Sequence, residues 1–158
     1  MMKDGTVLRA GPLSAVFDRG ELRWIRLGSR EVLRGIYFAL RAPGWVTIPK
    51  EISGLSLEAG PDRFRIRFTA THRRDGTHFE WQGTMDGEPD GTIRFAIDGI
   101  AHTRFLRNRI GLCVLHPIET CAGEPCAVEY VDGRMEPLAF PKHVAPHQPF
   151  LEDRKSVV

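Results

Sequence analysis

Apolar residues recur at every second position along much of the chain. In residues 63–68 arginines alternate with large apolar side chains, and the same period returns in residues 78–85 and 92–97. Successive side chains of a strand point to opposite faces, so each run places one apolar face on a core and one polar face toward water. This pattern is typical of antiparallel sheets with one solvated face.

Turn signals separate these runs and complete the prediction of the fold class. Asp-Gly pairs at 75–76, 90–91 and 132–133, and the Asp18-Arg19-Gly20 triplet, favour tight hairpin turns. Further strands are expected at 6–10, 13–17, 21–27, 31–40, 52–58, 109–116 and 126–131. Short strands spaced by turns are typical of sandwiches, so we expect an all-β protein, an antiparallel β-sandwich.

The alternation also predicts which side chains fill the core. The residues expected to be buried are Phe64, Ile66, Phe68, Phe79, Trp81, Ile93, Phe95, Ile97, Leu112 and Val114. Residues 136–150 contain four prolines, and each proline removes a hydrogen-bond donor from a sheet. We therefore expect this region to be an extended segment that leaves the domain, not a central strand.

Composition excludes several classes of function. The 158 residues suit a single domain, and a net charge of +2 with interleaved signs gives no basic footprint for nucleic acid. No apolar stretch approaches the roughly 20 residues that cross a bilayer, and no signal peptide is recognisable. Three cysteines are an odd number, which argues against a secreted disulfide framework. We expect a cytoplasmic protein that binds neither nucleic acid nor membrane.

No motif for self-sufficient catalysis is present. None of the internal serines lies in a Gly-x-Ser-x-Gly turn. Cys113, His116, Cys121 and Cys126 are residue types that bind zinc, but their spacing matches no zinc finger. Cys113 and His116 are three apart on an expected strand and so face opposite sides. We expect no catalytic residue, no metal and no cofactor.

The densest polar cluster surrounds one apolar strand near residue 110. Arginines and an asparagine precede this strand, and a histidine followed by proline ends it. Arginine suits carboxylates, and histidine titrates near neutrality, although these residues could equally cap the strand ends. One tryptophan lies in loop-like sequence after Pro43-Gly44. The candidate ligand or interdomain contacts are Trp45, Arg107, Asn108, Arg109, His116 and His147.

The run from Arg107 to Pro117, Arg-Asn-Arg-Ile-Gly-Leu-Cys-Val-Leu-His-Pro, resembles the N-terminal domain of the D-apionate lactonase family. The resemblance continues through Cys121–Cys126 and Pro146–Phe150. It implies a longer parent protein with an N-terminal β-sandwich, a central barrel domain and a further β domain. Family members add water to D-apionolactone and release D-apionate, in the breakdown of the sugar apiose. The resemblance thus implies an accessory domain, inactive without its missing C-terminal barrel domain.

The C-terminus departs from this family pattern. The last six residues, Asp-Arg-Lys-Ser-Val-Val, are what a common sequencing adapter encodes in one reading frame. We therefore expect residues 1–150 to be the N-terminal β-sandwich domain and residues 151–158 a non-native tail. Residues 140–158 are then expected to pack poorly, with Phe140, Phe150 and Leu151 on a surface that the missing domain would cover.

Two other functions stay open from the sequence. The chain could be a stand-alone sugar-binding module that takes a sugar acid at Trp45 and the arginine cluster. It could also be a mutarotase-like epimerase, since galactose-mutarotase-like supersandwich folds are β-sandwiches with His and Arg on one face. The last alternative rests on fold analogy alone.

Overall fold

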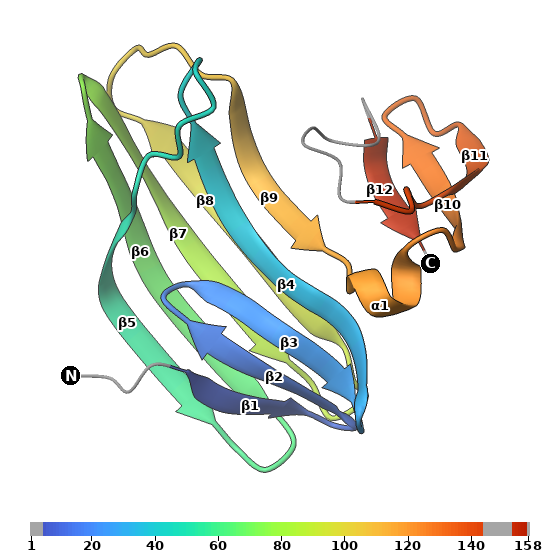
Figure 1. The fold of residues 1–158 in the computed structure, drawn as a ribbon. Coiled ribbons are helices and arrows are strands. Elements are labelled where there is room, and N and C mark those ends of the chain that lie inside the picture. The colour runs from blue at the N-terminus through green and yellow to red at the C-terminus, as the bar shows by residue number, and fades with distance from the viewer. Residues whose placement is uncertain (1–4, 144–152, 158) are drawn as a thin grey trace. The chain divides into compact units, whose positions relative to one another are not determined.

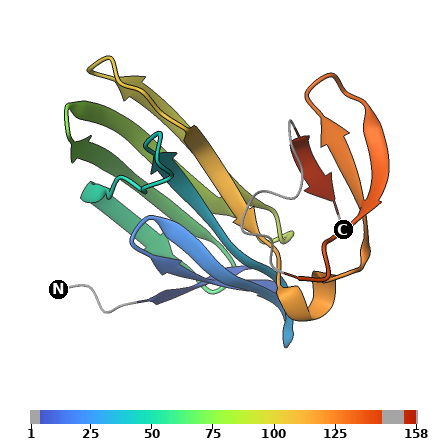
Figure 2. The same cartoon turned by 45° about the horizontal axis from the view of Figure 1, so that its top comes forward.

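The chain forms two compact units, Met1–Leu115 and His116–Val158 (Figure 1). The structure, a computed structural model, describes residues 5–143 and the backbone of residues 153–157. The first unit contains two antiparallel sheets that pack face to face (Figures 1 and 2). The five-stranded sheet has the order β1-β2-β3-β4-β9, and the four-stranded sheet has the order β5-β6-β7-β8. The predicted all-β antiparallel sandwich is confirmed.

The observed strands lie close to the predicted ones. In the five-stranded sheet they are β1 (Thr6–Ala10), β2 (Leu13–Asp18), β3 (Glu21–Leu27), β4 (Arg30–Arg41) and β9 (Arg109–Leu115). In the four-stranded sheet they are β5 (Glu51–Ala59), β6 (Phe64–Arg74), β7 (Thr77–Gly87) and β8 (Ile93–Ala101). The Asp18-Arg19-Gly20 and Asp75-Gly76 turns join consecutive strands, and Arg19 and Asp75 have positive φ, as such tight turns require.

The core lies between the sheets and follows the predicted alternation most closely on β6 and β7. Phe64, Ile66, Phe68, Phe79 and Trp81 are all buried, as predicted. They pack against side chains of the facing sheet, including Leu8, Phe17, Leu22, Phe38 and Leu40. Ile93, Phe95 and Ile97 point to the same core but are only partly buried, because β8 is an edge strand.

The prediction that Leu112 and Val114 are buried is wrong. They are 41% and 48% exposed. Their cross-strand partners are Phe38 and Ile36, so their side chains lie on the core-facing side of the sheet, as the alternation implied. Strand β9 is an edge strand, however, and its core-facing side is only partly covered. The alternation of apolar residues predicted which side of β9 faces the core, but not how much of that side is covered by other side chains.

The second unit is small and has its own core. It contains helix α1 (Ile118–Cys121) and strands β10 (Pro125–Tyr130), β11 (Met135–Ala139) and β12 (Asp153–Val157). The sheet order is β11-β10-β12, and Cys121, Cys126, Val128 and Phe140 form the core. No helix among the described residues is long and apolar enough to cross a membrane.

One expectation for the C-terminal region is confirmed only in part, and another is wrong. Residues 135–139 form strand β11, an edge strand, so they are not a central strand, as predicted, but they do belong to a sheet. Pro137 is tolerated there because an edge strand has one unpaired side. Phe140 is 9% exposed and packs in the small core, so it is not a bare surface residue. The backbone of residues 153–157 pairs with β10. Phe150 and Leu151 lie outside the described residues, and the division at residue 150 stays a prediction.

Gly83 is expected to be intolerant of any side chain. It pairs with Phe68 across β6 and β7, and a Cβ atom at Gly83 would lie 2.4 Å from the Phe68 ring. Phe68 is buried and has little room to shift. Gly83→Ala should therefore lower the free energy of unfolding by about 1–3 kcal/mol, the range for overpacked cores.

The matched control for this prediction is Gly44→Ala. A Cβ atom at Gly44 meets nothing within 4 Å, and its φ is not positive. Urea unfolding of both variants measures the difference. Equal stabilities of the two alanine variants would show that Phe68 repacks without cost.

Candidate functional site

Trp45 lies in a tight loop that leaves the end of β4. Its backbone N–H donates to the carbonyl of Ala42, and the N–H of Ala42 donates to the carbonyl of Val46, both at 2.9 Å. A bridge between Arg41 and Thr47 closes the loop. This loop lies at the same end of the sandwich as the connections between β6 and β7 and between β8 and β9 (Figure 1).

The backbone of Trp45 is held in an unusual conformation. Its φ is +66°, a region that bulky residues rarely occupy, and its side chain is 46% exposed. Such conformations persist only where the surrounding hydrogen bonds fix them, and they gather at functional sites. The loop thus presents a large aromatic surface to solvent.

Arg109 and Arg41 lie beside this tryptophan. The Arg109 guanidinium is 5.9 Å from the centre of the Trp45 ring, within the range of a cation–π contact. Arg41 is the cross-strand partner of Arg109, so both side chains emerge on the same face of the sheet. Among the described residues, no ion pair involves either arginine. Two guanidiniums without carboxylates favour an anionic partner.

Tyr37 adds a neutral polar group to the same face. Arg41 donates hydrogen bonds to the Thr47 hydroxyl at 3.2 Å and the Tyr37 hydroxyl at 3.5 Å. Burial and the neighbouring Cys113 raise the pKa of Tyr37, and Arg41 lowers it only in part. Tyr37 therefore stays a protonated phenol at neutral pH. Tyr37, Arg41, Trp45 and Arg109 are referred to below as the Trp45–Arg109 face.

The other predicted residues take different places. The backbone N–H of Asn108 donates to the carbonyl of Arg41 at 2.8 Å, which fixes the loop before β9. Arg107 lines a separate hollow of about 250 Å³ together with Phe79 and Phe105. The structure thus brings Trp45 and Arg109 into contact, and places Asn108 as a support and Arg107 next to a neighbouring hollow.

His116 is a packing residue of the second unit. Its ring lies 4.8 Å from that of Phe140, centre to centre. Its Nδ1 is covered and has no hydrogen-bond partner in the described part of the chain, and burial lowers its pKa. His147 lies outside the described residues.

The three cysteines are free thiols. Cys121 and Cys126 are buried in the small core, where thiols behave as small apolar groups. Burial raises the pKa of Cys126, which keeps this thiol protonated and unreactive at neutral pH.

One charged hollow was missed by the sequence reasoning. It measures about 790 Å³ and is lined by Glu21, Arg23, Lys50 and neighbours. The Glu21 carboxylate accepts from Lys50 Nζ at 2.8 Å and from Arg23 Nη2 at 2.6 Å. Glu21 and Lys50 are separated by 29 positions, so no local spacing could have revealed this arrangement.

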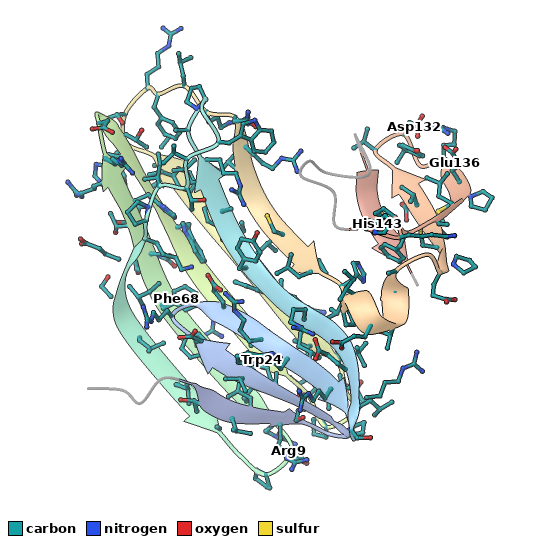
Figure 3. The ribbon with its side chains drawn as sticks, viewed as in Figure 1. Arg9, Trp24, Phe68, Asp132, Glu136 and His143 are labelled. Carbon is teal, nitrogen blue, oxygen red and sulfur yellow. The ribbon has the colours of Figure 1, made fainter. Side chains whose placement is uncertain are left out.

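Trp24 is a second exposed tryptophan. It lies on β3 (Figure 3) with φ of +48°, where the pairing of β2 with β3 shifts register, and it is 43% exposed. A bulge of this kind turns a side chain out of the regular alternation. Trp24 lines a hollow of about 390 Å³ whose lining contains one charged residue, Arg26. It lacks the paired arginines that accompany Trp45.

Comparison with known proteins gives two matches over nearly the whole chain. The family model described as the N-terminal domain of D-apionate lactonase matches residues 2–155. The chain is 35% identical over 152 residues to the D-apionate lactonase of Brucella anthropi. This alignment covers 94% of the chain and 25% of the relative, so the chain spans about a quarter of that protein's length. No solved structure matches.

Proposed function

Because the chain belongs to the family of D-apionate lactonase N-terminal domains, whose model matches residues 2–155, we propose that it serves as the accessory domain of a sugar lactone hydrolase. The parent enzyme adds water to D-apionolactone and releases D-apionate. One observation carries the proposal: 94% of the chain aligns with a D-apionate lactonase, but only with 25% of it. The catalytic groups belong to the remaining part of the parent, and the chain alone is inactive.

The partner of this domain is the barrel domain of the parent enzyme. The Trp45–Arg109 face supports an interface of mixed character, since an aromatic ring and two guanidiniums are typical anchors of protein contacts. Leu112 and Val114 leave further apolar area exposed on the opposite, core-facing side of β9. Interfaces between domains of one chain bury roughly 600–1,500 Å².

The proposal extends to the boundary of the domain and to the compartment in which the protein acts. We infer that residues 1–150 are the native domain and that residues 151–158 are a non-native tail, whose last six residues match the adapter reading frame. The protein is cytoplasmic, which the three free thiols support. It binds neither nucleic acid nor membrane.

A chimera tests the proposal. We expect no hydrolysis of D-apionolactone by the isolated chain. Replacing the N-terminal quarter of the Brucella anthropi relative by residues 1–150 of this chain should give an active enzyme. In that chimera Arg109→Ala should lower the rate by about tenfold, as the loss of an interface anchor worth about 1.4 kcal/mol does, whereas Arg26→Ala, on a different strand, should not. Lactone hydrolysis is followed by the release of acid.

Two results would contradict the proposal. One is turnover of the lactone by the isolated chain, which would place catalysis within these residues. The other is full activity of the relative after removal of its N-terminal quarter, which would leave the domain without an accessory role.

A sugar-acid-binding module is the second candidate function. It is favoured by the two arginines on the Trp45–Arg109 face, which no ion pair of the described residues occupies and which match a sugar carboxylate in charge. Binding of D-apionate to the isolated chain, together with an inactive chimera, would favour this candidate over the first.

A further inference from the structure

Two histidines and a glutamate gather on the outer face of the four-stranded sheet. His78 and Glu80 are two apart on β7, between the buried residues Thr77, Phe79 and Trp81, so both point away from the core. His102 follows the last residue of β8, and its N–H donates to the carbonyl of His78 at 2.9 Å. The two imidazole rings stack with their centres 4.3 Å apart.

The ligand atoms of these three residues converge. One ring nitrogen of each histidine and one carboxylate oxygen of Glu80 all lie within 4.8 Å of one another. The Nε2 atom of His78 is covered and has no hydrogen-bond partner among residues 5–143. A buried polar atom without a partner requires an explanation, and an ion that is not part of the structure is one of the usual ones.

We propose that His78, Glu80 and His102 form a binding site for a divalent transition metal, with zinc as the representative ion. Two imidazoles and one carboxylate are donors that zinc, nickel, copper and cobalt accept, whereas calcium and magnesium prefer oxygen ligands alone. Three protein ligands leave a fourth position to water. This site is independent of the proposed accessory role.

The geometry requires only a small closure on binding. Zinc lies about 2.0–2.1 Å from histidine nitrogens, so the ligand atoms of a tetrahedral site are roughly 3.3–3.5 Å apart. The observed separation of up to 4.8 Å must therefore shrink by about an ångström or more. His102 is exposed, and rotation of its side chain can supply this movement.

Neighbouring residues hold the backbone and the carboxylate in place. The Thr103 hydroxyl accepts from the N–H of His78 at 2.9 Å and donates to the carbonyl of Gly76 at 2.9 Å. The Thr71 hydroxyl donates to Glu80 Oε2 at 3.4 Å. Hydrogen bonds of this kind to a ligand orient it for the metal.

One cation lies beside the site. Arg73 on β6 is the cross-strand partner of His78, so its side chain emerges on the same face of the sheet. Arg73 is exposed and can turn its charge toward solvent when an ion binds.

The prediction of no metal site rests on the cysteine-containing run, which does not include these residues. The signal it missed is the His-x-Glu spacing of residues 78–80 together with the pairing of β7 and β8. That register pairs Phe79 with Ala101, so position 78 comes opposite position 102. A histidine at both positions is informative only once the register is known.

Calorimetric titration of the full, untagged chain with zinc chloride tests the site. We expect one ion per chain and a higher melting temperature with zinc, because an ion that binds only the folded state stabilises it. His102→Ala and His78→Ala should each weaken binding by at least about tenfold, and Glu80→Gln by a similar factor. His143→Ala is the matched control, since His143 is an exposed histidine of the second unit and should bind zinc like the unchanged chain.

Cobalt spectroscopy separates this site from the cysteines. The cobalt complex should lack a thiolate-to-metal charge-transfer band. Zinc binding that is undetectable, or that is unchanged in His102→Ala, would overturn the proposal. A charge-transfer band that disappears when the thiols are alkylated would also overturn it. Because His102 is exposed, its variant folds even if His78→Ala does not.

Discussion

Trp81→Ala is expected to lower the free energy of unfolding by about 3–5 kcal/mol, as large aromatic truncations in cores do. Trp81 is 1% exposed and lies at the centre of the sandwich core. Its ring is 4.7 Å from that of Phe38 and 5.2 Å from that of Phe68, centre to centre. Its indole N–H donates to Nε2 of the buried His72 at 3.1 Å. The alanine variant therefore loses packing on both sheets and leaves a buried acceptor unpaired.

Trp81→Phe separates these two contributions. It keeps most of the aromatic packing but removes the indole N–H, so its cost should be nearer the ~1–3 kcal/mol of one unpaired buried polar group. Guanidinium unfolding of both variants gives the comparison. A loss below about 1 kcal/mol for Trp81→Ala would show that the core is not organised around this side chain.

The second large effect is a loss of stability in mild acid. His72 is 1% exposed, its Nδ1 lies 2.9 Å from the carbonyl of Ile48, and its Nε2 accepts from Trp81. A neutral imidazole with its proton on Nδ1 can make both hydrogen bonds, donating to Ile48 and accepting from Trp81. A second proton on Nε2 would point at the indole N–H and break the hydrogen bond with Trp81. Burial lowers the pKa of His72 below its ordinary 6.5, despite the opposing hydrogen bond to Ile48.

The sign of the pH dependence follows from this lowered pKa. Below pH 6.5 the unfolded chain binds a proton at His72 that the folded chain does not, so unfolding becomes more favourable as the pH falls. The contribution of His72 to the free energy of unfolding is fully present above pH 6.5 and decreases below it. The decrease is at most about 1.4 kcal/mol per pH unit for one such group, and it ends once the pH falls below the pKa of His72 in the folded chain.

Urea unfolding between pH 5 and 8 measures this slope. His72→Gln should be less stable at neutral pH and should show a shallower dependence on pH. A residual slope of the same sign is expected from His78 and His116, whose pKa values are also lowered. Identical slopes for the unchanged chain and for His72→Gln would contradict this role of His72.

The strands were largely predictable because one face of each sheet is apolar and the other is polar. On β6 and β7 that contrast gave the buried residues directly. It failed at the edges, where Leu112 and Val114 lie on the core-facing side of β9 without full cover. Burial at an edge depends on how far the facing sheet extends, and that extent is not encoded in local periodicity.

The candidate sites differ in how much of them could be predicted from local sequence, because some of their contacts depend on the pairing of distant strands. Trp45 and Arg109 could be named from the sequence, because a tryptophan in a loop and an arginine before a strand are unusual locally. Their contact, and the convergence of His78 with His102, follow only from strand register. Phe140 was misassigned because the proline-rich sequence around it hid the short edge strand that ends just before it.

Pro137 on the edge strand β11 has a consequence for solubility. Proline has no N–H, so the free side of β11 presents an interrupted row of donors to any strand that approaches it. Natural sheets use such interruptions to prevent strands of neighbouring molecules from pairing with the edge. The small sheet of the second unit is therefore protected on this side against growth into β-aggregates, at the cost of one backbone donor.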